Sequence, residues 1–237
     1  MLVAAVLIPP TALLVPGAAG RADVLVEERR VAREAVAGLV AAGPEAVVVV
    51  VPGATRLAGT DLRPSLSAAG VGDRWSVGSE NQGPVVTDVP ASVALWLLAQ
   101  AGWGGPVEVI GVAGADPEVL AAPLRGPGRV AAVVVGGGSV RHGADAPLAG
   151  DPEATDVDGA LVDWLHGLTG GPHPPVPDGA LVAHHHLDAV APARVLAAAL
   201  PGSGLGFAGV TATAPFGATY LVASWRATAS AGGVDEP

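Results

Sequence analysis

The sequence predicts a single α/β domain: a mixed, mostly parallel central sheet with helices on both faces and an antiparallel strand pair at the C-terminal end. Three observations predict it. Val-rich apolar runs bounded by Gly or Pro recur along the chain, helix-like segments lie between them, and two strand-like runs joined by one turn close the sequence. Continuous apolar runs are typical of strands covered on both faces, and their alternation with helices favours parallel pairing.

Four runs are expected to form the parallel strands, and the helices are expected between and after them. Asp88 is a plausible N-cap with Pro90 in the first turn, and Gly43-Pro44 ends the preceding helix. The strands are Leu2–Ile8, Ala46–Val51, Val107–Val112 and Val130–Val135. The helices are Asp23–Ala42, Val89–Ala101, Asp156–Leu168 and Ala180–Leu200, the last broken near Pro192.

The closing strands are expected at Gly206–Thr213 and Ala218–Trp225, joined by a turn at 214–217. The long loops are Gly53–Thr87 and Thr169–Gly179, and long loops in compact domains are often binding regions. One domain is therefore expected over residues 1–237, with 227–237 as a disordered tail.

The first twenty residues carry no charged side chain, but they do not read as a targeting segment. No basic region precedes the apolar run, and Pro9, Pro10 and Pro16 interrupt it. A membrane helix needs about twenty apolar residues, preferably without such breaks. A buried first strand followed by a proline-rich loop is expected instead, in a cytoplasmic protein without a membrane partner.

Composition excludes several chemistries. The chain has 237 residues, of which half are apolar, and it contains neither Lys nor Cys. Schiff-base and phosphate-loop lysines, thiol nucleophiles, thiolate metal sites and disulfides are thus excluded. The net charge of −10 argues against a nucleic-acid partner, which calls for a basic surface.

The stretch RVAAVVVGGGSVRHG, residues 129–143, ends a predicted strand in three glycines followed by Ser139, Arg141 and His142. It is not a phosphate loop, because that loop needs a Lys, and no helix opens directly after these glycines. Arg141 stands where a serine-hydrolase elbow needs Gly. A Ser139/His142/Asp145 triad is not favoured, because nothing in the spacing places the imidazole on the hydroxyl.

Four segments in order carry a family resemblance: MLVAAVLIPPTALLVPG at the start, VVVVVPGAT at 47–55, VVVGGGSVRHGADAPL at 133–148 and TAPFGATYLVASW at 213–225. Together they resemble an actinobacterial branch of the class III extradiol ring-cleavage dioxygenases, related to the β subunit of protocatechuate dioxygenase and to Memo-like proteins. The resemblance spans nearly the whole chain. It implies a non-haem ferrous site of two His and one Glu, with another His as acid/base.

When the family's site residues are carried over by position, no side chain with a metal-binding or proton-accepting atom stands at the expected places. Pro10 and Gly53 stand at the two expected His ligands, and Val140 stands near the expected acid/base His. After Glu118 the only glutamates are Glu153 and Glu236, outside the closing strands. We therefore expect no cofactor and loss of ring cleavage, with the chain retained as a small-molecule-binding or interaction protein. A structural subunit that pairs with a catalytic homologue is an alternative.

The enzymatic alternative is a metal-dependent member of the family acting on an aromatic diol through ferrous iron or zinc at a repositioned His site. His142 lies two positions past the expected acid/base place and is expected to be a solvated loop residue. His184 and Asp188, at i and i+4 of a helix, could share a metal, with His166 or His173 recruited. Three consecutive His cannot converge on one ion on a regular helix, so a surface helix is expected.

The expected ligand is small and aromatic or anionic, and self-association as a homo-oligomer stays open. Trp75 lies in a long polar loop with Arg56 and Arg74 near it in sequence, and Arg141 follows the glycine loop. An indole and guanidinium groups suit an anionic aromatic ligand, although a loop Trp packs equally well onto its own domain.

Overall fold

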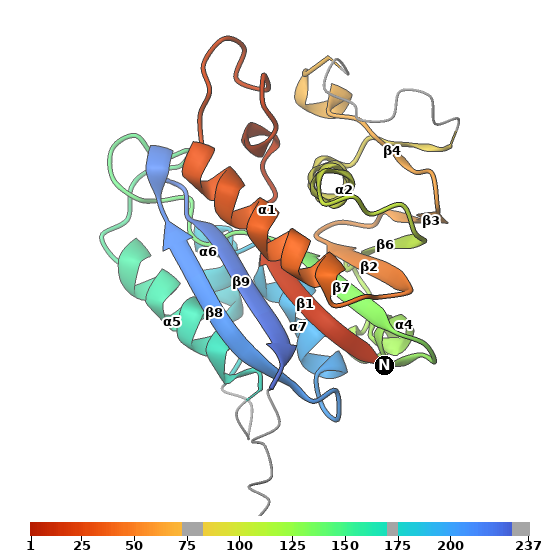
Figure 1. Ribbon diagram of the computed structural model, residues 1–237. Coiled ribbons are helices and arrows are strands. Elements are labelled where there is room, and N and C mark those ends of the chain that lie inside the picture. Colours follow the sequence, from red (N-terminus) through yellow and green to blue (C-terminus); the bar gives the residue numbers. More distant parts are fainter. Residues whose placement is uncertain (73–82, 170–174, 229–237) are drawn as a thin grey trace, which may run out of the picture.

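A sheet of seven strands runs through the centre of the described part of the molecule (Figure 1). The computed structural model describes residues 1–72, 83–169 and 175–228. The strand order is β3-β6-β2-β7-β1-β9-β8. The strands are β1 Leu2–Ile8, β2 Ala46–Val51, β3 Arg56–Gly59, β6 Val107–Gly111, β7 Val130–Val135, β8 Leu205–Thr213 and β9 Tyr220–Ala227.

The four central strands are parallel, as the sequence predicts. β7 pairs in parallel with β1 on one side and with β2 on the other, and β2 pairs in parallel with β6. The outer strands are antiparallel: β9 runs against β1, β8 against β9, and β3 against β6. The carboxyl ends of β1, β2, β6 and β7 therefore meet at one edge, which is where ligands bind in open α/β sheets.

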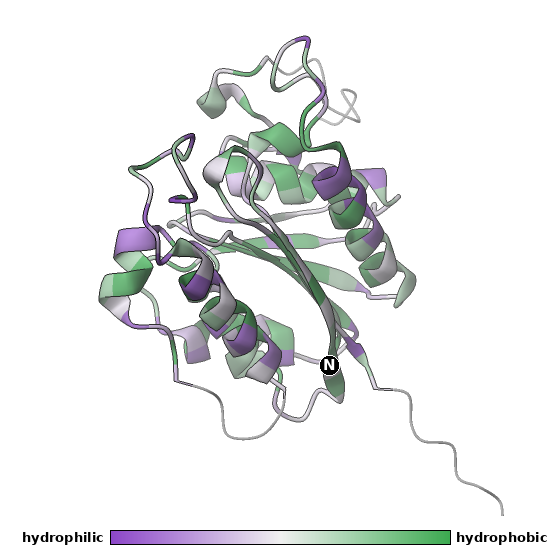
Figure 2. Ribbon diagram, turned by 90° about the vertical axis from the view of Figure 1, so that its left-hand side faces the viewer, coloured by the Kyte–Doolittle hydropathy of each residue, from purple (hydrophilic) through white to green (hydrophobic). Residues whose placement is uncertain are grey.

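The alternation of side chains along each strand divides the core between the two faces of the sheet. In β2, Val47, Val49 and Val51 belong to one buried cluster, whereas Val48 and Val50 belong to the other. Both faces are apolar, which explains why these strands are continuous runs of Val and Ala. Figure 2 shows the mostly hydrophobic central strands between two helical layers.

One face of the sheet is covered by two helices, and the other by the remaining ones (Figures 1 and 2). Asp88 caps the N-terminus of α2 by accepting a hydrogen bond from the amide of Ala91 at 2.9 Å, which confirms the predicted cap. The first layer contains α1 Val26–Ala41 and α2 Val89–Gln100. The second contains α3 Pro117–Leu120, α4 Ala122–Arg125, α5 Ala154–Gly167 and α7 Val190–Ala199, with α6 Gly179–His185 leading into α7.

The segment between β2 and α2 is more structured than the long loop that the sequence predicts. It contains β3, a short parallel pair formed by β4 Arg63–Pro64 and β5 Val85–Val86, and a 3-10 turn at Ser67–Ala69. This segment contacts α2, whose residues Ala91–Leu98 are all buried. A helix that is apolar on all sides needs such a second cover.

The break predicted near Pro192 in the helical stretch Ala180–Leu200 is wrong: the break lies between His185 and Val190. The chain leaves helix α6 at His185, His186 adopts the left-handed conformation with φ of 54°, and α7 begins at Val190. Pro192 lies buried in the first turn of α7, where a missing amide hydrogen removes no helical hydrogen bond.

In the described part of the chain, no helix has the length and apolar character that a membrane span requires.

Tyr220, the single tyrosine, tests the docking of α1 on β9. Burial, and then the carboxylate of Glu28, raise the pKa of the Tyr220 phenol above 10.0. We expect an ultraviolet absorbance titration to give a midpoint above 10, and Glu28→Gln to lower it, because the amide of Gln carries no charge. Circular dichroism at each pH keeps the comparison within the folded state.

The raised pKa of Tyr220 also determines how this residue contributes to folding stability as the pH changes. The folded state holds the phenolic proton more tightly than the unfolded chain, so this contribution is present below pH 10 and is lost as the pH rises through the folded pKa. An ordinary midpoint near 10 in the folded protein would contradict the docking of α1 over Tyr220.

Candidate functional site

Three glycines after β7 allow three other segments to approach the carboxyl edge closely. A Cβ on Gly136 would collide with the backbone of Ala189, and one on Gly138 would collide with Oδ1 of Asp158. A Cβ on Gly137 would lie 3.2 Å from the carbonyl oxygen of Thr219. The triplet is thus required by tight packing of the chain against itself, and this explains its sequence without a phosphate ligand.

The carboxyl group of Asp158 joins these segments. Oδ1 accepts a hydrogen bond from the backbone amide of Ser139 at 2.8 Å. Oδ2 accepts a hydrogen bond from the hydroxyl of Thr219 and lies 2.6 Å from Nε2 of His142, which is itself 2.8 Å from the Thr219 hydroxyl oxygen. Asp158 is buried, so these contacts satisfy a polar group that would otherwise be costly to enclose.

His142 is therefore not the solvated loop residue that the sequence predicts. Only 19% of its side chain is exposed, and its ring lies against Asp158 and Thr219. The reason is the backbone: the amide of His142 donates to the carbonyl of Gly217 at 3.0 Å, which places the loop beside the start of β9. The disfavoured triad is absent as well, because Ser139 pairs with His185 and not with His142.

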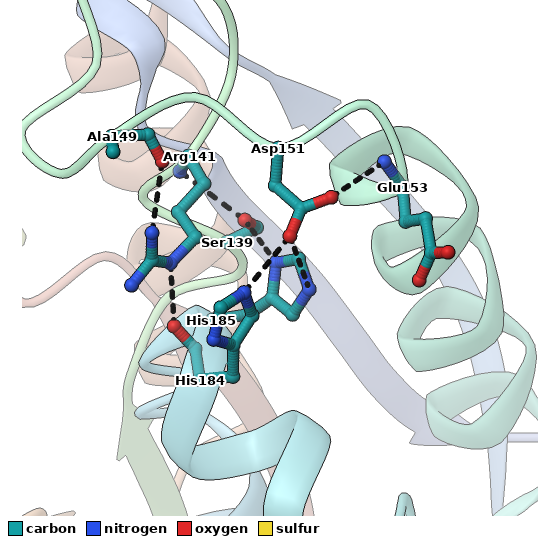
Figure 3. Close-up of polar contacts among 7 residues, drawn as sticks. All are labelled: Ser139, Arg141, Ala149, Asp151, Glu153, His184 and His185. Carbon is teal, nitrogen blue, oxygen red and sulfur yellow. Dashed lines mark hydrogen bonds and ion pairs between the residues drawn. The ribbon is translucent and has the colours of Figure 1, made fainter.

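A second polar cluster lies at the C-terminus of α6 (Figure 3). It is linked to the first through Ser139, which contacts both Asp158 and His185. Nε2 of His184 is 2.8 Å from Oδ2 of Asp151, and Nε2 of His185 is 3.9 Å from the same oxygen. On its other side, His185 Nδ1 is 2.9 Å from the hydroxyl oxygen of Ser139. The two imidazole rings and one carboxylate bring their donor atoms within 4.8 Å of one another.

Burial differs across this cluster. His185 is fully buried, and its Nε2 has no hydrogen-bond partner among the described residues. Asp151 is partly buried, with 20% of its side chain exposed, and half of the His184 side chain is exposed. The predicted surface helix with incidental His is therefore wrong at His185. The cluster is therefore buried on the side of His185 and exposed to solvent on the side of His184.

Asp151 is held in place by its own surroundings. Its Oδ1 accepts a hydrogen bond from the backbone amide of Glu153 at 2.9 Å, just before α5 begins (Figure 3). This amide first, and the hydrogen bond with His184 second, hold the pKa of the Asp151 carboxyl below its ordinary value. The oxygen that faces the two imidazoles is Oδ2, which is not used by that amide.

Arg141 fixes the loop to α6 and does not point at a ligand. Its guanidinium donates to the carbonyl of His184 at 2.6 Å and to the carbonyl of Ala149 at 2.9 Å (Figure 3). A cation at the C-terminus of a helix suits the unpaired carbonyls there. Asp188, the predicted metal partner of His184, lies beyond the end of α6 and is not part of the cluster.

Pro10, Gly53 and Val140 all lie at the edge of the sheet where the parallel strands end. Pro10 follows β1, Gly53 follows β2, and Val140 follows β7, all beyond the carboxyl ends of their strands. Gly53 has φ of 97° and lies beside Asp88, the cap of α2. Pro10 packs near Gly137. None of these three side chains can donate an electron pair to a metal.

The predicted ligand-binding side chains are not gathered at one place in the described chain. Arg56 is exposed on β3 and forms an ion pair with Glu108 at 3.5 Å. Arg141 donates hydrogen bonds to the carbonyls of His184 and Ala149. Arg74 and Trp75 lie outside the described residues, as does His173. His166 is on α5, where its ring packs against Phe207 with centroids 4.9 Å apart.

A pocket of about 370 Å³ lies elsewhere, between the short helices α3 and α4 and the ends of α5 and α7. Trp164, Leu168 and Val176 give it an apolar wall. Arg125 and Arg194 supply positive charge at its rim, next to Asp116 and Glu118. Sequence reasoning missed it, because its residues come from four separate segments and only Trp164 stands out by type.

Comparison with known proteins gives a fold and no family. No family model matches the chain, and no curated protein matches it. Among solved structures, it is similar to the crystal structure of an uncharacterized protein from Escherichia coli K12, with a TM-score of 0.52 and 15% sequence identity. The match covers 94% of this chain and 99% of that one, which shows that the single α/β fold occurs as a whole in a crystallised protein.

Replacing Asp158 tests its role in closing the carboxyl edge. We expect Asp158→Ala to lower the free energy of unfolding by about 3 kcal/mol, because it leaves buried donors of Ser139, His142 and Thr219 without an acceptor. Asp158→Asn should cost less, since the amide oxygen still accepts. Urea unfolding measures both.

The matched control is Asp163→Ala, on an exposed position of α5. It should change the free energy of unfolding by no more than about 0.5 kcal/mol. An equally small effect of Asp158→Ala would contradict the role given to this carboxyl group.

Proposed function

We propose that this chain is an extradiol-dioxygenase-like protein that has lost the family's ferrous site and ring cleavage, and that it acts by binding a small molecule. The observation that carries the proposal is the chemistry of the carboxyl edge. Pro10, Gly53 and Val140 occupy the positions of the expected ligands and acid/base, and none offers a donor atom. The family's iron does not fit these residues.

The packing around the glycine triplet supports the same conclusion. The hydrogen bonds of Asp158 to Ser139 and Thr219 tie the loop after β7 to α5 and β9. Backbone bonds reinforce this closure: the amide of Thr219 donates to Ser139 at 2.8 Å, and that of Gly138 donates to Thr219 at 3.1 Å. A catecholate and O₂ bound in this place would have to displace a satisfied network of buried polar groups, which is costly.

The pocket beside Trp164 is the site that we propose for the ligand. Its volume suits a small molecule, and its wall combines an indole with aliphatic side chains. Arg125 is already engaged, with Glu118 at 2.6 Å and with the carbonyl of Ala198. Arg194 is exposed and forms no hydrogen bond or ion pair within the described residues, so it is available to a carboxylate. We infer a small aromatic or aliphatic carboxylate as the ligand class.

Two assays on one untagged preparation test the proposal. After anaerobic loading with ferrous iron, we expect no oxygen consumption with catechol or protocatechuate. With a panel of aromatic and aliphatic carboxylates, we expect a concentration-dependent rise in Tm, because a ligand that binds only the folded state stabilises it. Arg194→Gln should reduce that rise, and Arg33→Gln, on exposed α1, should leave it unchanged.

Turnover of a catechol would overturn the loss of ring cleavage. A Tm that no carboxylate raises, or a rise that Arg194→Gln leaves intact, would overturn the binding site. The two parts of the proposal can therefore fail separately.

A further inference from the structure

We propose that Asp151, His184 and His185 form a binding site for a divalent first-row transition-metal ion, for which Zn²⁺ is the suitable probe. This site goes beyond the proposed function and uses none of the positions that the family resemblance assigns to iron. Two imidazoles and one carboxylate are a common protein donor set for such ions, and three protein ligands leave a position for water or a further ligand.

The distances between the three donor atoms suit a metal ion. Donor atoms bonded to Zn²⁺ at about 2.0–2.1 Å lie about 2.9–3.4 Å apart in octahedral or tetrahedral arrangements. Oδ2 of Asp151 is 2.8 Å from Nε2 of His184 and 3.9 Å from Nε2 of His185. Small rotations of side chains would bring all three atoms to coordination distance. The two rings are nearly perpendicular, at 80°, so their edges converge on the carboxylate instead of stacking.

One nitrogen of the His185 ring is buried and lacks a hydrogen-bond partner among the described residues. The residue is completely buried, and the atom concerned is its Nε2. Buried polar atoms are normally satisfied, and an exception needs an explanation. This nitrogen points toward Asp151 (Figure 3), 3.9 Å from its oxygen, which is too far for a hydrogen bond. A metal ion between them would satisfy both.

The other nitrogen of the same ring lies within hydrogen-bond distance of Ser139. Metal-binding imidazoles usually donate their second N–H to an acceptor, which fixes the tautomer and the orientation of the ring. His185 Nδ1 lies 2.9 Å from the hydroxyl oxygen of Ser139, which is buried and can accept that hydrogen. With the proton on Nδ1, the electron pair of Nε2 faces Asp151. Ser139 is therefore a positioning residue for this ligand.

The two adjacent His residues are the last two of α6, and the carboxylate of Asp151 approaches both of them from the loop before α5. His185 is the last residue of α6, and His186 turns the chain into the left-handed region. His186 itself is exposed and is not a ligand. The exposed side of His184 provides the entry path for the ion, while Asp151 is carried by the loop that leads into α5.

The test is isothermal titration of metal-free, untagged, full-length protein with Zn²⁺. We expect one site per chain, and we expect His184→Gln, His185→Gln and Asp151→Asn each to weaken it at least tenfold, since even groups beyond the ligands typically contribute about 10–100-fold. The matched controls are His166→Gln, on an exposed face of α5, and His186→Asn, which tolerates the left-handed conformation. Both should retain the affinity.

Circular dichroism and Tm without metal establish that each variant is folded. If His185→Gln does not fold, His184→Gln and Asp151→Asn decide the question, because their side chains reach the surface. Unchanged affinity in these variants, or an equal loss in His166→Gln, would overturn the site and indicate adventitious binding by surface imidazoles. Zn²⁺ binding is separate from catechol turnover and from carboxylate binding, so its failure leaves the proposed function untouched.

Discussion

The buried carboxyl group of Asp158 is the interaction on which the carboxyl edge of this sheet depends. It accepts hydrogen bonds from the loop after β7 and from the start of β9, and it is itself carried by α5. Because Gly138 has no side chain, the loop can approach Asp158 closely enough for the amide of Ser139 to be held by its carboxylate. Ser139 in turn orients His185, so one carboxyl group sets the positions of residues in both polar clusters.

The sequence predicted the layers and most of the elements, because continuous apolar runs and helix boundaries are local signals. The parallel strands, the capped helix behind Asp88 and the closing strand pair follow from such patterns. The breakpoint near Pro192 was wrong, since proline in the first turn begins a helix as readily as it ends one. The site could be predicted only in part. Asp151 and His184 are separated by 33 positions, and nothing local indicates that they meet.

The glycine stretch after β7 shows why a motif alone did not give a function. Its three glycines serve close packing against Ala189, Thr219 and Asp158, and its Ser and His serve buried polar contacts. The residues that could bind a metal lie further along the chain, at the C-terminus of α6 and in the loop before α5. Pro10, Gly53 and Val140 offer no side-chain donor at the strand ends, whereas Asp151, His184 and His185 offer three near a helix end. Both arrangements are compatible with one fold, because a fold does not fix a function.

Metal binding at this edge is assigned to the Asp151–His184–His185 cluster and not to the strand ends. Anomalous diffraction from crystals of the untagged chain grown with Zn²⁺ tests it most directly. We expect one strong anomalous peak bonded by Oδ2 of Asp151 and by Nε2 of both His184 and His185. A peak beside Pro10, Gly53 and Val140, or peaks only on scattered surface imidazoles, would contradict it.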